Sequence, residues 1–250
     1  MFLNSPLEQF TVFKILPLSL GSIDISFTNS SLFLTISFIF MFSALHTIWS
    51  KALLIPFAWQ NIMESAYGFV YYNIISENVK KGGNLYFTVL FSVFNFILFC
   101  NLLGMIPYGF TVTSHIVITL GLASTIFVGI NYIGIKAHGF HILSLFLPPG
   151  APLLMAPLLV FIEIVSYSFR VISLSLRLFA NMMSGHCLLK ILAGFAWAML
   201  SSFSLLSLVH ILPLIVIVAI IGLELGIAFL QAYVFTLLLC VYLNDAICLH

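Results

Sequence analysis

The sequence predicts an all-α protein that crosses a membrane several times, and three observations lead to this fold class. First, 62% of the residues are hydrophobic and only 6% are charged, with a mean hydropathy of +1.23, a composition that would aggregate in water. Second, the apolar runs are continuous rather than alternating, which favours helices over a transmembrane β-barrel. Third, several runs reach the roughly twenty residues that one crossing needs.

Residues 1–30 form an N-terminal segment, and residues 31–55 hold the first predicted transmembrane helix. Its apolar run extends from Ser31 to Trp49, and Trp49 with Lys51 are expected to anchor it at the membrane interface. Residues 56–84 mix Trp and Tyr with Gln, Asn, Glu and Lys. This mixture is typical of an amphipathic segment that lies along the membrane surface without crossing it.

Residues 85–135 are predicted to form a transmembrane hairpin. One apolar run extends from Leu85 to Ile106 and the next from Val112 to Ile135, and the short link between them implies antiparallel helices. Residues 136–151 contain several Gly and Pro residues and are expected to be a loop.

Residues 152–250 are predicted to form a long helical hairpin. The stretch from Pro152 to Gly194 has no strong interior breaker, and as one helix it would measure about 65 Å against a hydrocarbon core of about 30 Å. It therefore either breaks into two crossings or lies steeply tilted beside a protein partner. The run from Ser202 to Leu243 poses the same problem, and Ala196 to Ser201 is the expected link.

A polar stripe follows one face of the first long segment, because residues three or four apart are neighbours on a helix. A seam that joins two helices would explain the Ser and Asn members. Two arginines and a glutamate instead favour a functional site, since an arginine cannot lose its proton to escape lipid. The stripe consists of Glu163, Ser166, Arg170, Ser173, Arg177, Asn181 and Ser184.

Other polar residues in the long hairpin leave alternatives open. His186 faces nearly the opposite side from Arg177 and is either a packing residue or a proton carrier. Glu224 shares a face with Gln231 and must either pair or take up a proton. The small residues around them, Gly222, Gly226 and Ala228, permit close approach of another helix. Asp245 is either functional or a solvated residue near the chain's end.

Charge and motif content exclude several classes of function. A net charge of +1 offers no basic patch for nucleic acid. The four cysteines lack the spacing of metal ligands, so we expect neither a disulfide nor a metal. The seven histidines suggest no haem-type pair, no Gly-x-x-x-x-Gly-Lys loop is present, and we expect no cofactor. Residues 1–10 resemble neither a secretory signal nor a transit peptide, although a processed precursor would look the same.

The string Ser175-Leu176-Arg177-Leu178-Phe179-Ala180-Asn181-Met182, followed by Gly185-His186 and later by Glu224 and Leu230-Gln231-Ala232-Tyr233-Val234-Phe235, resembles subunit a of the F-type ATP synthase, the mitochondrial ATP synthase subunit 6 family. Residues 5–10 and 101–107 also look familial, whereas residues 14–81 match only in general layout. The resemblance implies about six helices, with one along the membrane surface and the last two long and steeply inclined.

The resemblance also implies roles for individual residues. Arg177 would face the rotating ring of c subunits and separate two offset proton half-channels. Asn181 and Gln231 match polar positions near that arginine, and Glu163 with Asp245 match acidic positions of the matrix-side half-channel. His186 and Glu224 look like the mitochondrial pattern of an acid and a base that pass protons as a coupled pair.

The expected function is therefore that of a stator subunit in the mitochondrial inner membrane, where proton flow drives rotation and ATP synthesis. It would not be an enzyme by itself. Its expected partners are the c-subunit ring, other membrane-sector and peripheral-stalk subunits, membrane lipids and protons, with no nucleic acid. A secondary proton-coupled transporter is the alternative, but it should contain internal repeats, and we find none in the sequence.

Overall fold

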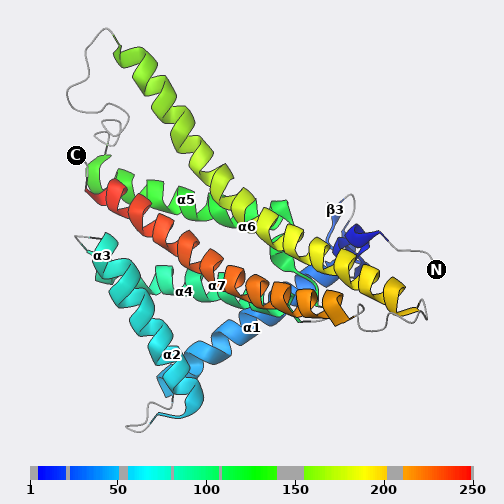
Figure 1. The fold of residues 1–250 in the computed structure, drawn as a ribbon. Coiled ribbons are helices and arrows are strands. Elements are labelled where there is room, and N and C mark those ends of the chain that lie inside the picture. The colour runs from blue at the N-terminus through cyan, green and yellow to red at the C-terminus, as the bar shows by residue number, and fades with distance from the viewer. Residues whose placement is uncertain are drawn as a thin grey trace.

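The computed structural model describes residues 5–20, 23–50, 56–79, 82–106, 109–139, 155–201 and 211–248. Within these ranges six long helical segments make up nearly all of the structure (Figure 1). Five helices are long and apolar enough to cross a membrane, so the predicted all-α polytopic class is confirmed. The candidate spans are Asn29–His46, Gly83–Gly104, Ile116–His138, Ala156–Met199 and Pro213–Ile247.

The N-terminal segment contains short elements that sequence reasoning did not predict. A 3-10 helix, η1 (Pro6–Phe10), precedes two small antiparallel ladders. The first pairs β1 (Lys14–Leu16) with β4 (Phe27–Thr28), and the second pairs β2 (Ser19–Leu20) with β3 (Ile23–Asp24). An ion pair between Lys14 and Asp24 links the two ladders. The hydrogen bond from Lys14 lowers the pKa of Asp24.

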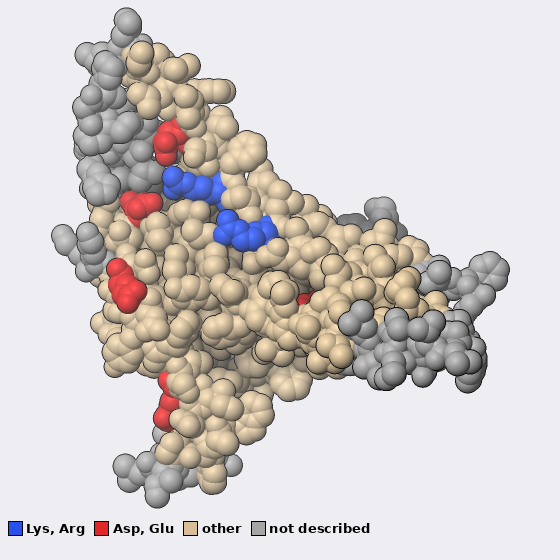
Figure 2. Space-filling model, viewed as in Figure 1, with Lys and Arg blue, Asp and Glu red and all other residues tan. Residues whose placement is uncertain are grey.

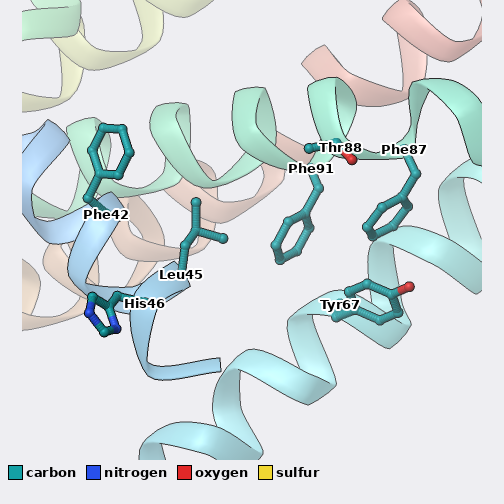
Figure 3. Close-up of a pocket in the computed structure, with 7 residues that line it drawn as sticks. All are labelled: Phe42, Leu45, His46, Tyr67, Phe87, Thr88 and Phe91. Carbon is teal, nitrogen blue, oxygen red and sulfur yellow. The ribbon is translucent and has the colours of Figure 1, made fainter. Parts of the chain in front are cut away.

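The segment predicted to lie along the membrane surface is one continuous helical stretch. Helix α2 (Ala58–Gly68) continues through a π-helical stretch, η2 (Phe69–Ile75), into α3 (Ser76–Asn78). It is not among the candidate spans. The π-helical stretch buries one face against α7 and α4, while α2 contacts α1 (Asn29–Ser50). A cavity of about 740 Å³, lined mainly by apolar and aromatic side chains, lies among α1, α2 and α4 (Figure 3).

Helices α4 (Gly83–Gly104) and α5 (Ile116–His138) run in opposite directions (Figure 1). Each packs against α7, and a cavity of about 320 Å³ lies between them. The second apolar run was predicted to begin its helix at Val112, but Val112–Ser114 form a buried 3-10 turn, η3. Ser114 Oγ supports the turn by donating to the carbonyl of Thr111 at 2.6 Å. Thr111 in turn packs against Gly104, where a Cβ would lie 2.1 Å from Thr111 Cγ2.

The two longest helices are α6 (Ala156–Ser201) and α7 (Ile211–Ile247). The 46 residues of α6 form one unbroken helix of about 69 Å, so it does not divide into two crossings. The predicted link from Ala196 to Ser201 is therefore wrong. Its residues include good helix formers and no Gly or Pro, and nothing in it ends the helix. Pro213 lies in the first turn of α7, where proline is tolerated.

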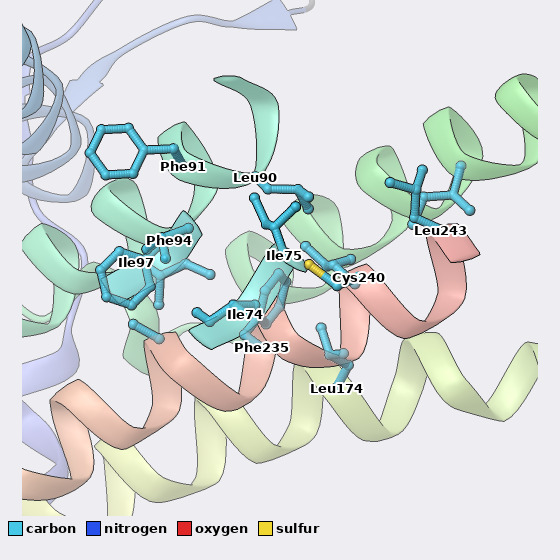
Figure 4. Close-up of a cluster of buried hydrophobic side chains, with 14 of the residues drawn as sticks. Ile74, Ile75, Leu90, Phe91, Phe94, Ile97, Leu174, Phe235, Cys240 and Leu243 are labelled. Carbon is cyan, nitrogen blue, oxygen red and sulfur yellow. The ribbon is translucent and has the colours of Figure 1, made fainter. Parts of the chain in front are cut away.

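The core lies where the π-helical stretch, α4, α6 and α7 meet (Figure 4). Apolar side chains from all four elements interdigitate there, and buried Thr119 of α5 and Ser175 of α6 form a 3.2 Å hydrogen bond beside them. This packing holds α7 in the middle of the bundle and fixes its register against α6. The core includes Val70, Ile74, Ile75, Leu90, Phe94, Ile97, Leu174, Leu178, Ala232, Phe235, Leu239 and Cys240.

Some predicted features lie outside the described residues. These are the side chain of Trp49, Lys51, most of the loop at residues 136–151, and the start of the run at Ser202. The predicted segment boundaries remain predictions.

Candidate functional site

Helices α6 and α7 are antiparallel, and polar side chains meet between them at three levels. The first level joins Arg170 to two carboxylates. Arg170 Nη2 lies 3.5 Å from Glu163 Oε1, and Arg170 Nη1 lies 3.9 Å from Asp245 Oδ2. Glu163 is two helical turns from Arg170 on the same face, whereas Asp245 comes from the last turns of α7. Asp245 thus lies within ion-pair distance of Arg170, while its side chain remains 41% exposed, and whether it is functional stays a prediction.

Aromatic side chains and α5 complete this first level. The Arg170 guanidinium carbon lies 5.6 Å from the ring centroid of Tyr167 and 5.3 Å from that of Tyr242. The Tyr167 hydroxyl donates to Asn131 Oδ1 on α5 at 2.5 Å. Sequence reasoning did not single out these three residues. Tyr167 stands three positions before Arg170, and Tyr242 three before Asp245, so helical spacing could have identified both tyrosines.

The second level is a hydrogen bond between amides. Asn181 Nδ2 donates to Gln231 Oε1 at 3.0 Å, and Gln231 is buried. This contact joins two of the predicted site residues across the helix pair. It also fits the alternative that part of the polar stripe holds the helices together.

The third level brings His186 and Glu224 together. His186 Nε2 lies 3.5 Å from Glu224 Oε1, and Glu224 is only 2% exposed. Among the described residues, neither carboxylate oxygen has a hydrogen-bond partner. The close approach depends on Gly185, because a Cβ there would lie 2.8 Å from Glu224 Oε1. Sequence reasoning missed this role of Gly185.

The small residues of α7 behave differently from one another. Ala228 is fully buried inside the bundle, so another helix of the same chain approaches it. Asn101 of α4 donates to its carbonyl oxygen at 3.2 Å. Gly222 and Gly226 are exposed, and no described atom lies within 4 Å of where their Cβ would be. Among the described residues, these two glycines therefore do not serve as close-packing positions.

Arg177 differs from every other charged residue of the site. It is exposed, and no described residue forms an ion pair or hydrogen bond with it. Its neighbours Leu174 and Leu178 are buried, so α6 turns the arginine away from the core. On the face seen in Figure 2, the visible basic side chains lie over α6, with acidic side chains on the same face. The remaining stripe residues Ser166, Ser173 and Ser184 are exposed, and the hydroxyls of Ser173 and Ser184 donate to carbonyl oxygens of α6 itself.

The positions along α6 give the site its chemical character. Arg177 lies about 10 Å beyond Arg170 and about 14 Å before His186 along the helix axis. Groups able to bind and release protons therefore lie on both sides of a residue that keeps its positive charge. The described residues contain no group of three His, Cys, Asp or Glu side chains that could hold a metal ion.

Comparisons with known proteins give a consistent result. The family model described as ATP synthase A chain matches residues 30–244. ATP synthase subunit a of Marchantia polymorpha is 51% identical over 251 residues, which cover 98% of this chain and 99% of that protein. The Chondrus crispus protein of the same name is 53% identical over 249 residues, covering 99% and 98%. ATP synthase subunit a-2 of Arabidopsis thaliana is 49% identical over 257 residues, covering 100% and 73%.

Proposed function

The chain belongs to the ATP synthase A chain family, and from this premise we propose that it is the stator subunit against which a ring of c subunits rotates. Membership makes it a multi-pass subunit of the membrane sector of the F-type ATP synthase. Protons would reach the ring through one half-channel and leave through another. The subunit would guide protons and bind no nucleotide, so the chemistry of ATP would belong to its partners.

The observation that carries this proposal is the separation of two proton-binding clusters by Arg177. Glu163 and Asp245 lie on one side of it along α6, and the His186–Glu224 pair lies on the other. Each cluster has the groups that a half-channel needs to exchange protons with water. Since neither cluster reaches past Arg177, protons would have to travel between the half-channels on the ring.

Arg177 would act electrostatically. A permanently charged guanidinium attracts a deprotonated ring carboxylate and cannot relay a proton itself. An ionised carboxylate is costly in hydrocarbon, so it would have to be protonated before it rotates into lipid. Exposure of Arg177 on the outer face of α6 supports this role. Ala180 and Ser184, which follow it on the same face, are small enough for a ring helix to approach.

The proposed surroundings follow from the same site. The His186–Glu224 contact resembles the mitochondrial pattern, so we place the subunit in the mitochondrial inner membrane. The peripheral stalk and other membrane-sector subunits would hold it still, and lipids would cover the apolar side chains that α6 and α7 expose. Without this attachment to the peripheral stalk and the other subunits, the ring and the stator would turn together, and proton flow would not drive synthesis.

The test is ATP synthesis by sealed inner-membrane vesicles that contain Arg177→Ala. We expect synthesis to fall to background while the complex still assembles, because the residue is exposed and contributes no core packing. Lys136→Ala is the matched control, since Lys136 is an exposed base in the last turn of α5 and belongs to neither proton-binding cluster. Coupled synthesis by an assembled Arg177→Ala complex would overturn the proposal.

A further inference from the structure

We infer that Asn131, Tyr167 and Tyr242 are positioning residues that hold the Arg170 guanidinium between Glu163 and Asp245, so that both carboxylates stay free to exchange protons. This inference rests on the proposed function and specifies how one half-channel works. The three residues come from α5, α6 and α7, and none of them carries a charge that could itself neutralise Arg170 in the contacts described.

The two ion pairs of Arg170 are longer than strong charge-assisted hydrogen bonds. Such bonds span about 2.7–2.9 Å, whereas Arg170 lies 3.5 Å from Glu163 and 3.9 Å from Asp245. An unrestrained guanidinium would be expected to bind one carboxylate through two parallel hydrogen bonds. Arg170 instead lies between the two and binds neither closely, so some other contact must hold it.

The aromatic rings supply that contact. The guanidinium carbon lies within 6 Å of both ring centroids, the range in which a cation is attracted by an aromatic face. Tyr167 is fixed from α5 by its hydrogen bond to Asn131 Oδ1. The Asn131 amide is itself oriented, because its Nδ2 donates to the carbonyl of Phe127 at 3.0 Å. The Phe127 ring, 4.7 Å from the Tyr167 ring by their centroids, supports the tyrosine on another side.

The contacts by which Asn131, Tyr167 and Tyr242 position Arg170 are called the clamp below. Loss of the clamp should change proton exchange and not only stability. If Arg170 moved onto one carboxylate, that carboxylate would be held in its ionised form and would take up protons less readily. The titratable or charged groups of the cluster come from two helices: Glu163, Tyr167 and Arg170 of α6, and Tyr242 and Asp245 of α7. From α5, His138 reaches the same end of α7, where its Nε2 lies 2.8 Å from the carbonyl oxygen of Ile247.

The experiment measures the pH profile of ATP-driven proton pumping by the assembled ATP synthase in sealed vesicles, normalised to the amount of complex. Tyr167→Leu, Asn131→Leu and Tyr242→Leu should each move the alkaline limb of the profile by about half a pH unit or more toward lower pH. Tyr242→Phe keeps the aromatic face, so its pH profile should stay close to that of the wild type and show little of the shift caused by Tyr242→Leu. Tyr132→Leu is the control, because Tyr132 adjoins Asn131 but is exposed.

The outcomes separate this inference from the proposed function. Unchanged pH profiles in assembled Tyr167→Leu and Asn131→Leu complexes would overturn the clamp, whatever their yield. A shift in Tyr132→Leu as large as in Asn131→Leu would also overturn it. Glu163→Gln and Asp245→Asn address the half-channel directly. If both pump as wild type does, the proposed function fails at this cluster; if they lose pumping while the clamp variants keep the wild-type profile, only the clamp fails.

Discussion

Replacing Gly185 by alanine tests whether the contact between His186 and Glu224 takes part in proton transfer. The added methyl group would lie 2.8 Å from Glu224 Oε1, 3.1 Å from its Cδ and 3.4 Å from its Cγ. The first distance is shorter than a stable contact allows, so the carboxylate must turn away from α6. Glu224 is only 2% exposed, but its carboxylate is the end of a flexible side chain and can turn within the site. The turn therefore lengthens the 3.5 Å separation from His186.

Two opposing effects set the stability of Gly185→Ala. Alanine favours the helix by about 1 kcal/mol relative to glycine. Overpacking against Glu224 costs about 1–3 kcal/mol, and the lower part of that range applies because a side-chain terminus can shift more easily than backbone. The two nearly cancel, so the complex should assemble. Proton transfer is more sensitive, since a misplacement of about 1 Å can cost about 100-fold in rate.

The assay is ATP synthesis driven by an imposed proton gradient in sealed vesicles, expressed per assembled complex. We expect a loss of about tenfold or more for Gly185→Ala. Gly121→Ala is the matched control, because Gly121 also lies inside a helix but, apart from its chain neighbours and its own helix backbone, no described atom lies within 4 Å of the added methyl group. Wild-type synthesis by Gly185→Ala would refute the reasoning that places this contact in the proton path.

Two further predictions concern stability. Gly104→Ala should destabilise the protein by about 1–3 kcal/mol, because its Cβ would lie 2.1 Å from Thr111 Cγ2. Thr111→Ser removes that methyl group, so adding it to Gly104→Ala should restore part of the lost thermal unfolding temperature. An unfolding temperature that stays low in the double variant would contradict the steric explanation. His115, just before α5, stacks on Phe110 with centroids 5.1 Å apart, and burial lowers the pKa of His115. Its contribution to stability is thus complete above about pH 6.5, the unfolded value, and is lost as the pH falls through the lower folded value. The unfolding temperature measured from pH 8 to 5 should fall less in His115→Phe; an equal fall in both proteins would show that this histidine does not cause it.

The helices could be predicted from the sequence because few backbone structures are stable in lipid. A backbone in hydrocarbon must satisfy its own hydrogen bonds, so apolar runs of sufficient length become helices. The predicted link at Ala196 to Ser201 failed because the same requirement favours continuing the helix there. Its residues are compatible with a helix, and only a Gly or Pro would have indicated the end of α6 in the sequence. The prediction that the next helix begins at Val112 failed for a different reason. A side-chain hydrogen bond and burial against α4 and α6 favour a 3-10 turn at Val112–Ser114.

The candidate site was only partly predictable. Helical periodicity shows which residues share a face of one helix, but it does not show which residues of other helices lie against that face. It placed Arg170 and Arg177 on one side of α6, yet it could not indicate that Asp245, 75 positions after Arg170, would reach the first arginine and not the second. Asn131 was missed because its link to Tyr167 depends on the register of α5 against α6. Gly185 was missed because its function is to leave space for a side chain of another helix.

The contrast between the two arginines bears on what lies outside the chain. Arg170 has two carboxylates and two aromatic rings around it, so its charge is compensated within the protein. Arg177 has the same side chain on the same helix, but no described residue pairs with it. An uncompensated guanidinium near hydrocarbon is costly, and in the proposed function a partner would supply the anion. A carboxylate that arrives on a rotating ring and leaves once protonated would meet that requirement without immobilising the ring.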